Sequence, residues 1–331
     1  MSALKSLLRL PIDALALFTQ AKSFEDNAFI GNRLLNRLGL HVLRVVLAHT
    51  AMAIRRTLMA WKLPPEDRKA FARDGFLIKP NFLEHSQFLN LGQDVIKIAT
   101  DEAPQDSVQG DTLTRQYPIT DQRLARYPNL HTAMQNPQYQ SLLGYVAGRL
   151  RVPFRWVQVI YNGQLPSDEA DPQRTPHSDT FQPAMKAWLF LTEANESNGA
   201  FSYVPGSHRL SLARLKWEYR QSIVGRDLDS RYSARGSLRI KHEELAQLGL
   251  PQPRELRCEA NTLIVADTRG FHCRGASNGK TVHRVEIWAL SRTNPFNPLP
   301  GLPFAVLDRL ERRVFPKFEQ WRQQYFKQSA P

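Results

Sequence analysis

The chain has 331 residues, of which 42% are hydrophobic, and it carries 44 Lys or Arg against 31 Asp or Glu, for a formal net charge of +13. This length is enough for one large globular domain with additions, and it argues against two independent large domains. The two cysteines, Cys258 and Cys273, are too few for a disulfide framework, which favours an intracellular protein in a reducing compartment.

Residues 1–64 are predicted to form a basic amphipathic helical extension, because they contain nine Lys or Arg and only three acidic residues. On a helical wheel the basic side consists of Arg33, Arg37, Arg44, Arg55 and Lys62, and the aliphatic side of Val42, Val46, Ala53 and Ala60. Two alternatives follow. The arginines reach the phosphates of an anionic membrane whose headgroup region buries the aliphatic side, or the aliphatic side packs on the protein core.

This extension is not predicted to cross a membrane. Ten residues separate Arg44 from Arg55, whereas a transmembrane helix needs about twenty apolar residues. Asp13 interrupts the apolar stretch that could serve in a signal peptide, and no convincing small-residue cleavage site follows it. We therefore expect a cytoplasmic protein. If the basic extension contacts a membrane, that contact would be peripheral and at the inner face of the membrane.

The composition changes at Pro64 and Pro65, where a central domain over residues 65–303 is predicted to begin. Short apolar runs bounded by turn residues predict buried strands at residues 154–161, 187–191, 200–204, 263–266 and 281–290. A polar turn at 193–199 joins the second and third of these strands, and Pro and Gly at 205–208 end the pair. The sequence therefore predicts a hairpin over residues 187–208.

Two possible metal ligands, His177 and Asp179, precede this hairpin. They are two residues apart, so on an extended strand both side chains leave the same face and can reach one ion. An imidazole and a carboxylate, completed by a second imidazole, form the facial triad of non-haem Fe(II) enzymes, which leaves positions open for a co-substrate and O2. A hydrogen-bonded surface pair is the alternative, because a His-x-Asp triplet also arises by chance.

His272 is the candidate for the second imidazole, since it follows the predicted strand 263–266 and a turn and would begin the next strand at a rim of the sheet. Arg284 lies twelve residues later in another strand-like run. A guanidinium group offers a rigid fork for a carboxylate, as a dicarboxylate co-substrate that chelates iron by its other end would require. The order of these groups along the chain is His-x-Asp, His and then Arg.

Together these motifs resemble the phytanoyl-CoA dioxygenase-like family of Fe(II)/2-oxoglutarate oxygenases. The matching positions are His177, Asp179, Trp188, Asn198–Gly199 ahead of Pro205–His208, His272, Asn278 and Arg284. The resemblance implies a mainly β fold with added helices, in which a double-stranded β-helix, or jelly roll, carries iron at one mouth. It also implies Fe(II), 2-oxoglutarate and O2 as cofactors and co-substrates, and hydroxylation of a C–H bond.

In that resemblance His177, Asp179 and His272 hold the metal, and Arg284 anchors 2-oxoglutarate. Three further residues are candidates for cofactor binding. Trp188 is a matching position, Gln158 could face the site from its strand, and Arg274 could bind the co-substrate or an anionic substrate. The alternative for Gln158 is a structural role, and for Arg274 it is a place on the surface of a strand.

Two other segments flank this core. A basic insert at residues 208–250, with nine Lys or Arg against three acids over 208–241, also holds the aromatic residues Trp217, Tyr219 and Tyr232. It is either a lid that contacts an anionic substrate or a solvated helix and loop. Residues 304–331 are predicted to be a C-terminal helix bent at Pro316.

The basic regions favour an anionic substrate met at a membrane surface, either a lipid or a lipid-linked sugar. The alternatives are a soluble acyl-CoA or small metabolite, and a catalytically silent jelly-roll protein that binds at a membrane. Nucleic acid is not the expected partner despite the positive charge, because the sequence contains no recognisable nucleic-acid-binding motif and the charge is confined to segments.

Overall fold

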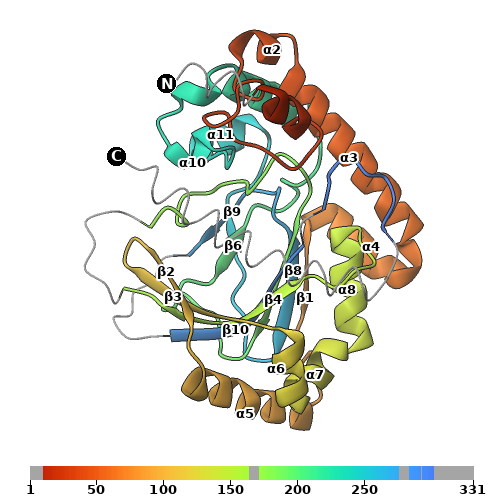
Figure 1. The fold of residues 1–331 in the computed structure, drawn as a ribbon, viewed down its shortest axis with the longest axis vertical. Coiled ribbons are helices and arrows are strands. Elements are labelled where there is room, and N and C mark those ends of the chain that lie inside the picture. The colour runs from red at the N-terminus through yellow and green to blue at the C-terminus, as the bar shows by residue number, and fades with distance from the viewer. Residues whose placement is uncertain (1–9, 164–170, 276–282, 292, 302–331) are drawn as a thin grey trace.

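The computed structural model describes residues 10–163, 171–275, 283–291 and 293–301, and the predicted C-terminal helix and Asn278 lie outside them (Figure 1). Within these residues ten strands form two antiparallel sheets. The large sheet contains, in spatial order, β1 (Phe76–Lys79), β8 (Thr262–Asp267), β5 (Met185–Phe190), β10 (His283–Ser291), β4 (Phe154–Tyr161), β3 (Thr112–Pro118) and β2 (Gln105–Gln109). The small sheet contains β7 (Arg254–Glu255), β6 (Phe201–Tyr203) and β9 (His272–Arg274).

Helices surround these sheets. The N-terminal group is α2 (Arg33–Arg37), α3 (Leu40–Leu58), η1 (Ala60–Lys62) and α4 (Pro65–Asp74). The second group is α5 (His85–Asp101), α6 (Asp121–Arg126), α7 (Pro128–Gln135) and α8 (Pro137–Ala147). The third group is α9 (Leu212–Ile223), η2 (Gly225–Asp227), α10 (Arg231–Ala234) and α11 (His242–Gln247).

The two faces of the large sheet have different environments, because side chains alternate along each strand. One face is apolar and packs on α5, α7 and α8, with strand residues such as Val157, Leu189 and Ile287 in the same buried cluster as the helices. The opposite face turns toward the small sheet, where Trp188 of β5 lies over Phe201 of β6 with ring centroids 4.3 Å apart. The predicted jelly-roll core with added helices is confirmed, and the strands predicted from the sequence correspond to β4, β5, β6, β8 and β10.

The long helix α3 is oriented in a way that the helical wheel did not predict. Arg44 and Arg55 are only 4% and 2% exposed. Arg44 donates hydrogen bonds of 2.7 to 3.1 Å to three carbonyl groups within residues 17–21, and Arg55 donates to Thr293 Oγ1 at 2.9 Å. The expectation that these arginines form an outward basic side is wrong, because protein oxygens are their hydrogen-bond acceptors.

The expected aliphatic side of α3 is not its buried side either, since Ala53 is exposed and Val42 and Val46 are only partly buried. The side that packs on the protein consists of His41, Arg44, Val45, Ala48, Ala51, Met52 and Arg55. In the part of the chain that the structure describes, no helix is both long enough and apolar enough to cross a bilayer.

The basic insert forms α9, η2, α10 and α11, and it packs on the N-terminal extension. Asn36 of α2 donates a hydrogen bond to the Ser222 carbonyl at 3.0 Å, and the Phe24 amide donates to the Ala234 carbonyl at 2.9 Å. Trp217 is buried against Phe271, with ring centroids 5.4 Å apart. The insert is therefore a docked layer rather than a solvated helix and loop, which was one of its two predicted alternatives, and it lies beside the segment that precedes β9.

Candidate metal centre

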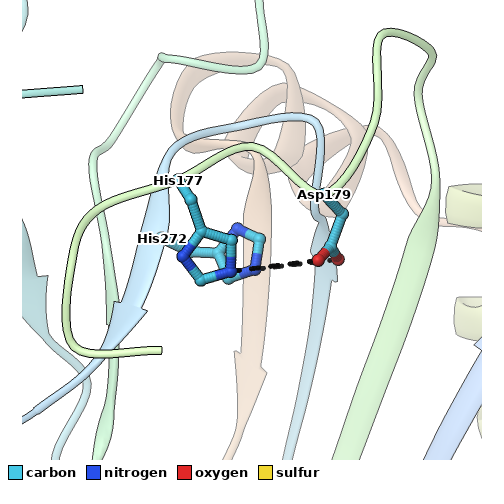
Figure 2. A group of neighbouring side chains, drawn as sticks. All are labelled: His177, Asp179 and His272. Carbon is cyan, nitrogen blue, oxygen red and sulfur yellow. Dashed lines mark ion pairs between the residues drawn. The ribbon is translucent and has the colours of Figure 1, made fainter. Parts of the chain in front are cut away.

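The fold brings His177, Asp179 and His272 together at one end of the small sheet (Figure 2). The His177 segment pairs with β9 through two backbone hydrogen bonds, in which the amide of each histidine donates to the carbonyl of the other at 2.9 Å. The Asp179 amide donates to the Thr268 carbonyl at 3.0 Å. This extended pairing places one ligand atom of each of the three residues within 4.8 Å of the other two.

Both imidazoles are oriented by the same kind of hydrogen bond. Nδ1 of His177 lies 2.8 Å from the Thr175 carbonyl, and Nδ1 of His272 lies 2.9 Å from the Gly270 carbonyl. A carbonyl only accepts, so each Nδ1 carries the proton and each Nε2 presents a lone pair. This arrangement is the usual support of a metal-binding histidine.

The two Nε2 atoms face the Asp179 carboxylate. They lie 3.9 Å (His177) and 3.7 Å (His272) from its oxygens. Two ligand atoms bound to one ion at about 2.1 Å cannot be more than about 4.2 Å apart, so these separations are compatible with a shared ion. The residues present therefore fit a metal with two nitrogen ligands and one oxygen ligand.

The electrostatics of the three groups also favour metal binding. Burial, reinforced by the neighbouring His272, holds the pKa of His177 well below its usual range, and burial also lowers the pKa of His272 against the opposing effect of Asp179. Burial acts to raise the pKa of the Asp179 carboxyl, but Lys186 and the two imidazoles outweigh it and hold that pKa well below its usual range. Neutral imidazoles and an ionised carboxylate are the protonation states that bind a metal ion.

Sequence reasoning missed Lys186, whose Nζ lies 2.7 Å from Asp179 Oδ2. Lys186 belongs to β5 and lies on the same face of the sheet as Trp188, two residues later. Lys22 of the N-terminal extension also donates to the backbone carbonyl of Asp179. The available signal was a single lysine at the start of an otherwise apolar strand.

A cavity of about 260 Å³ lies between the two sheets and is lined by His272 of the metal centre. The four residues predicted to bind the cofactor, Gln158, Trp188, Arg274 and Arg284, all line it as well. Arg274 Nη1 lies 3.0 Å from Asp171 Oδ2. Arg274 is therefore a cavity residue with an ion-pair partner rather than a fully exposed one.

Arg284 is 4% exposed and is held by neighbouring acceptors. Its Nε donates to Glu286 Oε2 at 2.9 Å, and its Nη1 donates to the Asn198 carbonyl at 3.3 Å and to the Gly199 carbonyl. Asn198 and Gly199, which the family resemblance singled out, thus orient this arginine.

Glu286 is a second residue that sequence reasoning missed. It is fully buried, it lines the cavity, and its Oε1 has no hydrogen-bond partner among the residues that the structure describes. Burial raises its pKa, although Arg284 opposes that effect. Its position two residues after Arg284 on one strand was the available signal, because such residues share a face.

Comparisons with known proteins complete the description. The family model of phytanoyl-CoA dioxygenase (PhyH) matches residues 71–242, a range that includes His177 and Asp179 and ends before His272. Comparison with the curated proteins found no match.

Three solved structures illustrate the structural similarity. The non-heme alpha ketoglutarate dependent epimerase SnoN from nogalamycin biosynthesis is 19% identical, with a TM-score of 0.47 over 68% of this chain and 81% of that chain. HygX from Streptomyces hygroscopicus, with nickel and 2-oxoglutarate bound, is 14% identical, with a TM-score of 0.43 over 69% and 86%. AviO1 from Streptomyces viridochromogenes Tue57 is 18% identical, with a TM-score of 0.41 over 69% and 94%.

The sequence match and the site geometry point to the same assignment. The matched range is more than half of the chain and contains the His-x-Asp pair, and the fold adds a second histidine to that pair. This protein therefore belongs to the phytanoyl-CoA dioxygenase family and is an Fe(II)- and 2-oxoglutarate-dependent enzyme.

Proposed function

We propose that the enzyme is a dioxygenase that hydroxylates a C–H bond of an anionic, lipid or lipid-linked substrate, with His177, Asp179 and His272 as its iron ligands. The observation that carries this proposal is the pair of Nδ1 hydrogen bonds to the Thr175 and Gly270 carbonyls. These bonds direct both Nε2 lone pairs to the side on which Asp179 lies. If His177 and Asp179 were only a surface pair formed by chance, neither histidine ring would need to be held in this orientation.

The iron and 2-oxoglutarate, when bound, supply the chemistry that activates O2 for attack on a C–H bond. The protein's contribution is to position and shield the reacting groups. The buried imidazoles stay neutral, and Lys186 helps to keep Asp179 ionised. The two sheets form the walls of the cavity next to His272, and such low-dielectric walls strengthen charge interactions inside a cleft.

Arg284 is the proposed anchor for the far carboxylate of 2-oxoglutarate. It is a buried cation in the same cavity as His272, and the Asn198 and Gly199 carbonyls fix its orientation. A guanidinium group of fixed orientation binds a carboxylate with two parallel hydrogen bonds. Trp188 and Gln158 line the cavity from β5 and β4, the strands on either side of β10, which carries Arg284, and would contact the same co-substrate.

The cations of the cavity are the feature that supports an anionic substrate. Among the described residues its lining includes Lys186, Arg274 and Arg284 against one acid, Glu286, while Asp179 and Asp171 pair with the first two. It also includes four amide side chains: Gln109, Gln116, Gln158 and Gln173. This polar lining favours a sugar or a headgroup inside the cavity, with any acyl chain remaining outside it.

A soluble anionic metabolite is the second candidate, because a polar volume of about 260 Å³ also suits a small molecule that is not attached to a lipid. The two candidates share the reaction and the metal centre. They differ in whether a membrane presents the substrate.

Anaerobic titration with Fe(II) and 2-oxoglutarate tests the assignment, monitored by the weak visible charge-transfer band of the chelate. We expect the band in the wild type and its loss in Asp179→Ala and His272→Ala. His131→Ala, an exposed histidine on α7, is the matched control and should keep the band. Folded wild-type protein without the band, and without iron-dependent turnover of 2-oxoglutarate, would instead favour a catalytically silent binding protein.

A further inference from the structure

The outward side of the N-terminal helices is apolar, and the proposed chemistry does not use it. Six large side chains, here called the outer stripe, are between 43% and 76% exposed: Leu38, Leu43, Leu47, Ile54, Leu58 and Trp61. The four of them that belong to α3 lie within about 60° of one another at 100° per residue. They therefore form one continuous line along the helix.

The outward side of α3 is unusual for a surface helix. Arg44 and Arg55 are almost completely buried on its inward side, together with apolar residues, and its leucines point outward. Because polar side chains normally occupy the exposed side of such a helix, this arrangement indicates that another apolar phase covers the outer stripe.

The surroundings of the outer stripe are positively charged. The sequence contains no acidic residue between Asp26 and Glu66. Arg33 and Arg37 of α2 are exposed, as are Lys216 and Arg220 of α9, the helix that packs against α2 and α3. The acid of α9, Glu218, is 1% exposed and contributes no surface charge.

This charge discriminates between the possible partners of the stripe. A second copy of the chain would bring a basic surface against a basic surface. Residues 302–331 of the same chain carry six Lys or Arg and three acids, so they too would bring net positive charge. An anionic bilayer supplies both an apolar phase and the opposite charge.

We propose that α2 and α3 dock the protein on an anionic membrane surface, with the outer stripe in the headgroup region and α3 parallel to the bilayer. Trp61 stands at the end of the stripe, and the Lys62 ammonium group lies 4.7 Å from its ring centroid. A tryptophan next to a lysine is suited to the boundary between apolar chains and headgroups. This docking deepens the proposed function by placing the enzyme where a lipid-linked substrate is found, but it does not depend on the metal centre.

Vesicle co-sedimentation of the full chain at low salt tests the proposal. We expect binding to vesicles of phosphatidylcholine mixed with phosphatidylglycerol, and little binding to phosphatidylcholine alone. The double variant Leu47→Glu/Ile54→Glu should lower the bound fraction by about tenfold or more. The matched control is Leu89→Glu/Ile96→Glu, which has the same seven-residue spacing on α5, at the opposite end of the molecule from α2 (Figure 1). It should bind as the wild type does.

Three results would overturn this docking. The first is absence of wild-type binding to the anionic vesicles. The second is a dimer in light scattering that the Leu47→Glu/Ile54→Glu variant converts to a monomer. The third is a melting temperature of this variant well below that of the α5 control, since residues of the chain itself would then cover the stripe. Turnover of 2-oxoglutarate in solution is measured separately, so an active enzyme that ignores vesicles refutes the docking and leaves the proposed function intact.

Discussion

Two buried glutamates, Glu218 in the basic insert and Glu286 in the cavity, both pair with arginine, and they differ in how completely they are neutralised. Glu218 Oε1 accepts hydrogen bonds from Arg214 at 2.6 Å and from Arg269 at 2.8 Å, and Glu218 Oε2 lies 3.2 Å from His41 Nε2. Glu286 accepts one hydrogen bond from Arg284 through Oε2, while Oε1 has no partner among the described residues.

The pKa values of the two carboxyl groups shift in opposite directions, although burial acts to raise both. Burial acts to raise the pKa of Glu218, but Arg269 and Arg214 outweigh it and hold that pKa well below its usual range. Burial dominates at Glu286 and raises its pKa. Both oxygens of the first carboxylate are paired, and this carboxylate fixes Arg269 in the turn that precedes His272. The second carboxylate has one unpaired oxygen and lies in the cavity, which is the pattern expected where a ligand completes the site.

Removing the charge of Glu218 should have the largest effect on stability. The variant Glu218→Gln leaves Arg214 and Arg269 buried without a carboxylate, which should lower the free energy of unfolding by about 3–5 kcal/mol. Denaturant unfolding at neutral pH measures it, with the exposed Glu243→Gln as the control. A loss below about 1 kcal/mol would mean that the charge of Glu218 is not what stabilises the two buried arginines.

Replacing Arg284 should mainly affect the co-substrate. The variant Arg284→Met removes the proposed carboxylate anchor, and the loss of a charge-assisted pair worth about 1.5–3 kcal/mol predicts a rise of about 10- to 150-fold in the KM for 2-oxoglutarate. Stability should fall less than in Glu218→Gln, because Glu286 can take up a proton when its partner is lost. An unchanged KM would mean that another cation of the cavity binds the far carboxylate of 2-oxoglutarate.

The pH dependence of stability should separate the two glutamates. Glu218 has a lowered pKa, so its contribution is present above the pKa of the unfolded chain and is lost as the pH falls. Glu286 has a raised pKa, so between about pH 4.3, the unfolded value, and its folded pKa the native state binds more protons, and stability decreases as the pH rises.

The variant Glu286→Gln tests whether Glu286 makes the protein less stable as the pH rises. It should unfold with nearly the wild-type free energy below about pH 4 and should become the more stable protein as the pH rises. Denaturant unfolding of both proteins across this range measures the difference. A difference that does not change with pH would show that Glu286 titrates normally.

Much of the site could be predicted from the sequence, because local spacing determines it. The two-residue spacing of His177 and Asp179 needs only an extended backbone, and His272 follows the apolar run of β8 and a short turn. Lys186 and Glu286 could not be placed in the same way, because their importance depends on which strands are neighbours. Glu286 lies opposite both Gln158 of β4 and Phe190 of β5, and that register is a property of the whole sheet.

The orientation of α3 could not be predicted for a related reason. A helical wheel groups arginines with the polar side, because it assumes that charged side chains face water. Here Arg44 finds carbonyl acceptors within residues 17–21, and Arg55 finds Thr293, at positions distant in sequence. Tertiary hydrogen bonds therefore decide the orientation of the helix, and they leave its leucines outside.

Replacing Arg274 should have the smallest effect. It decides whether this arginine binds the co-substrate, which the sequence left open. Arg274 lines the cavity but is paired with Asp171 at 3.0 Å, whereas the carboxylate that pairs with Arg284 keeps one oxygen without a partner among the described residues. We expect Arg274→Gln to change the Kd of 2-oxoglutarate, measured anaerobically through the charge-transfer band, by less than about threefold, or about 0.6 kcal/mol. A tenfold loss would make Arg274 part of the co-substrate site, whereas a small one would assign it to the ion pair with Asp171 that holds it in the wall of the cavity.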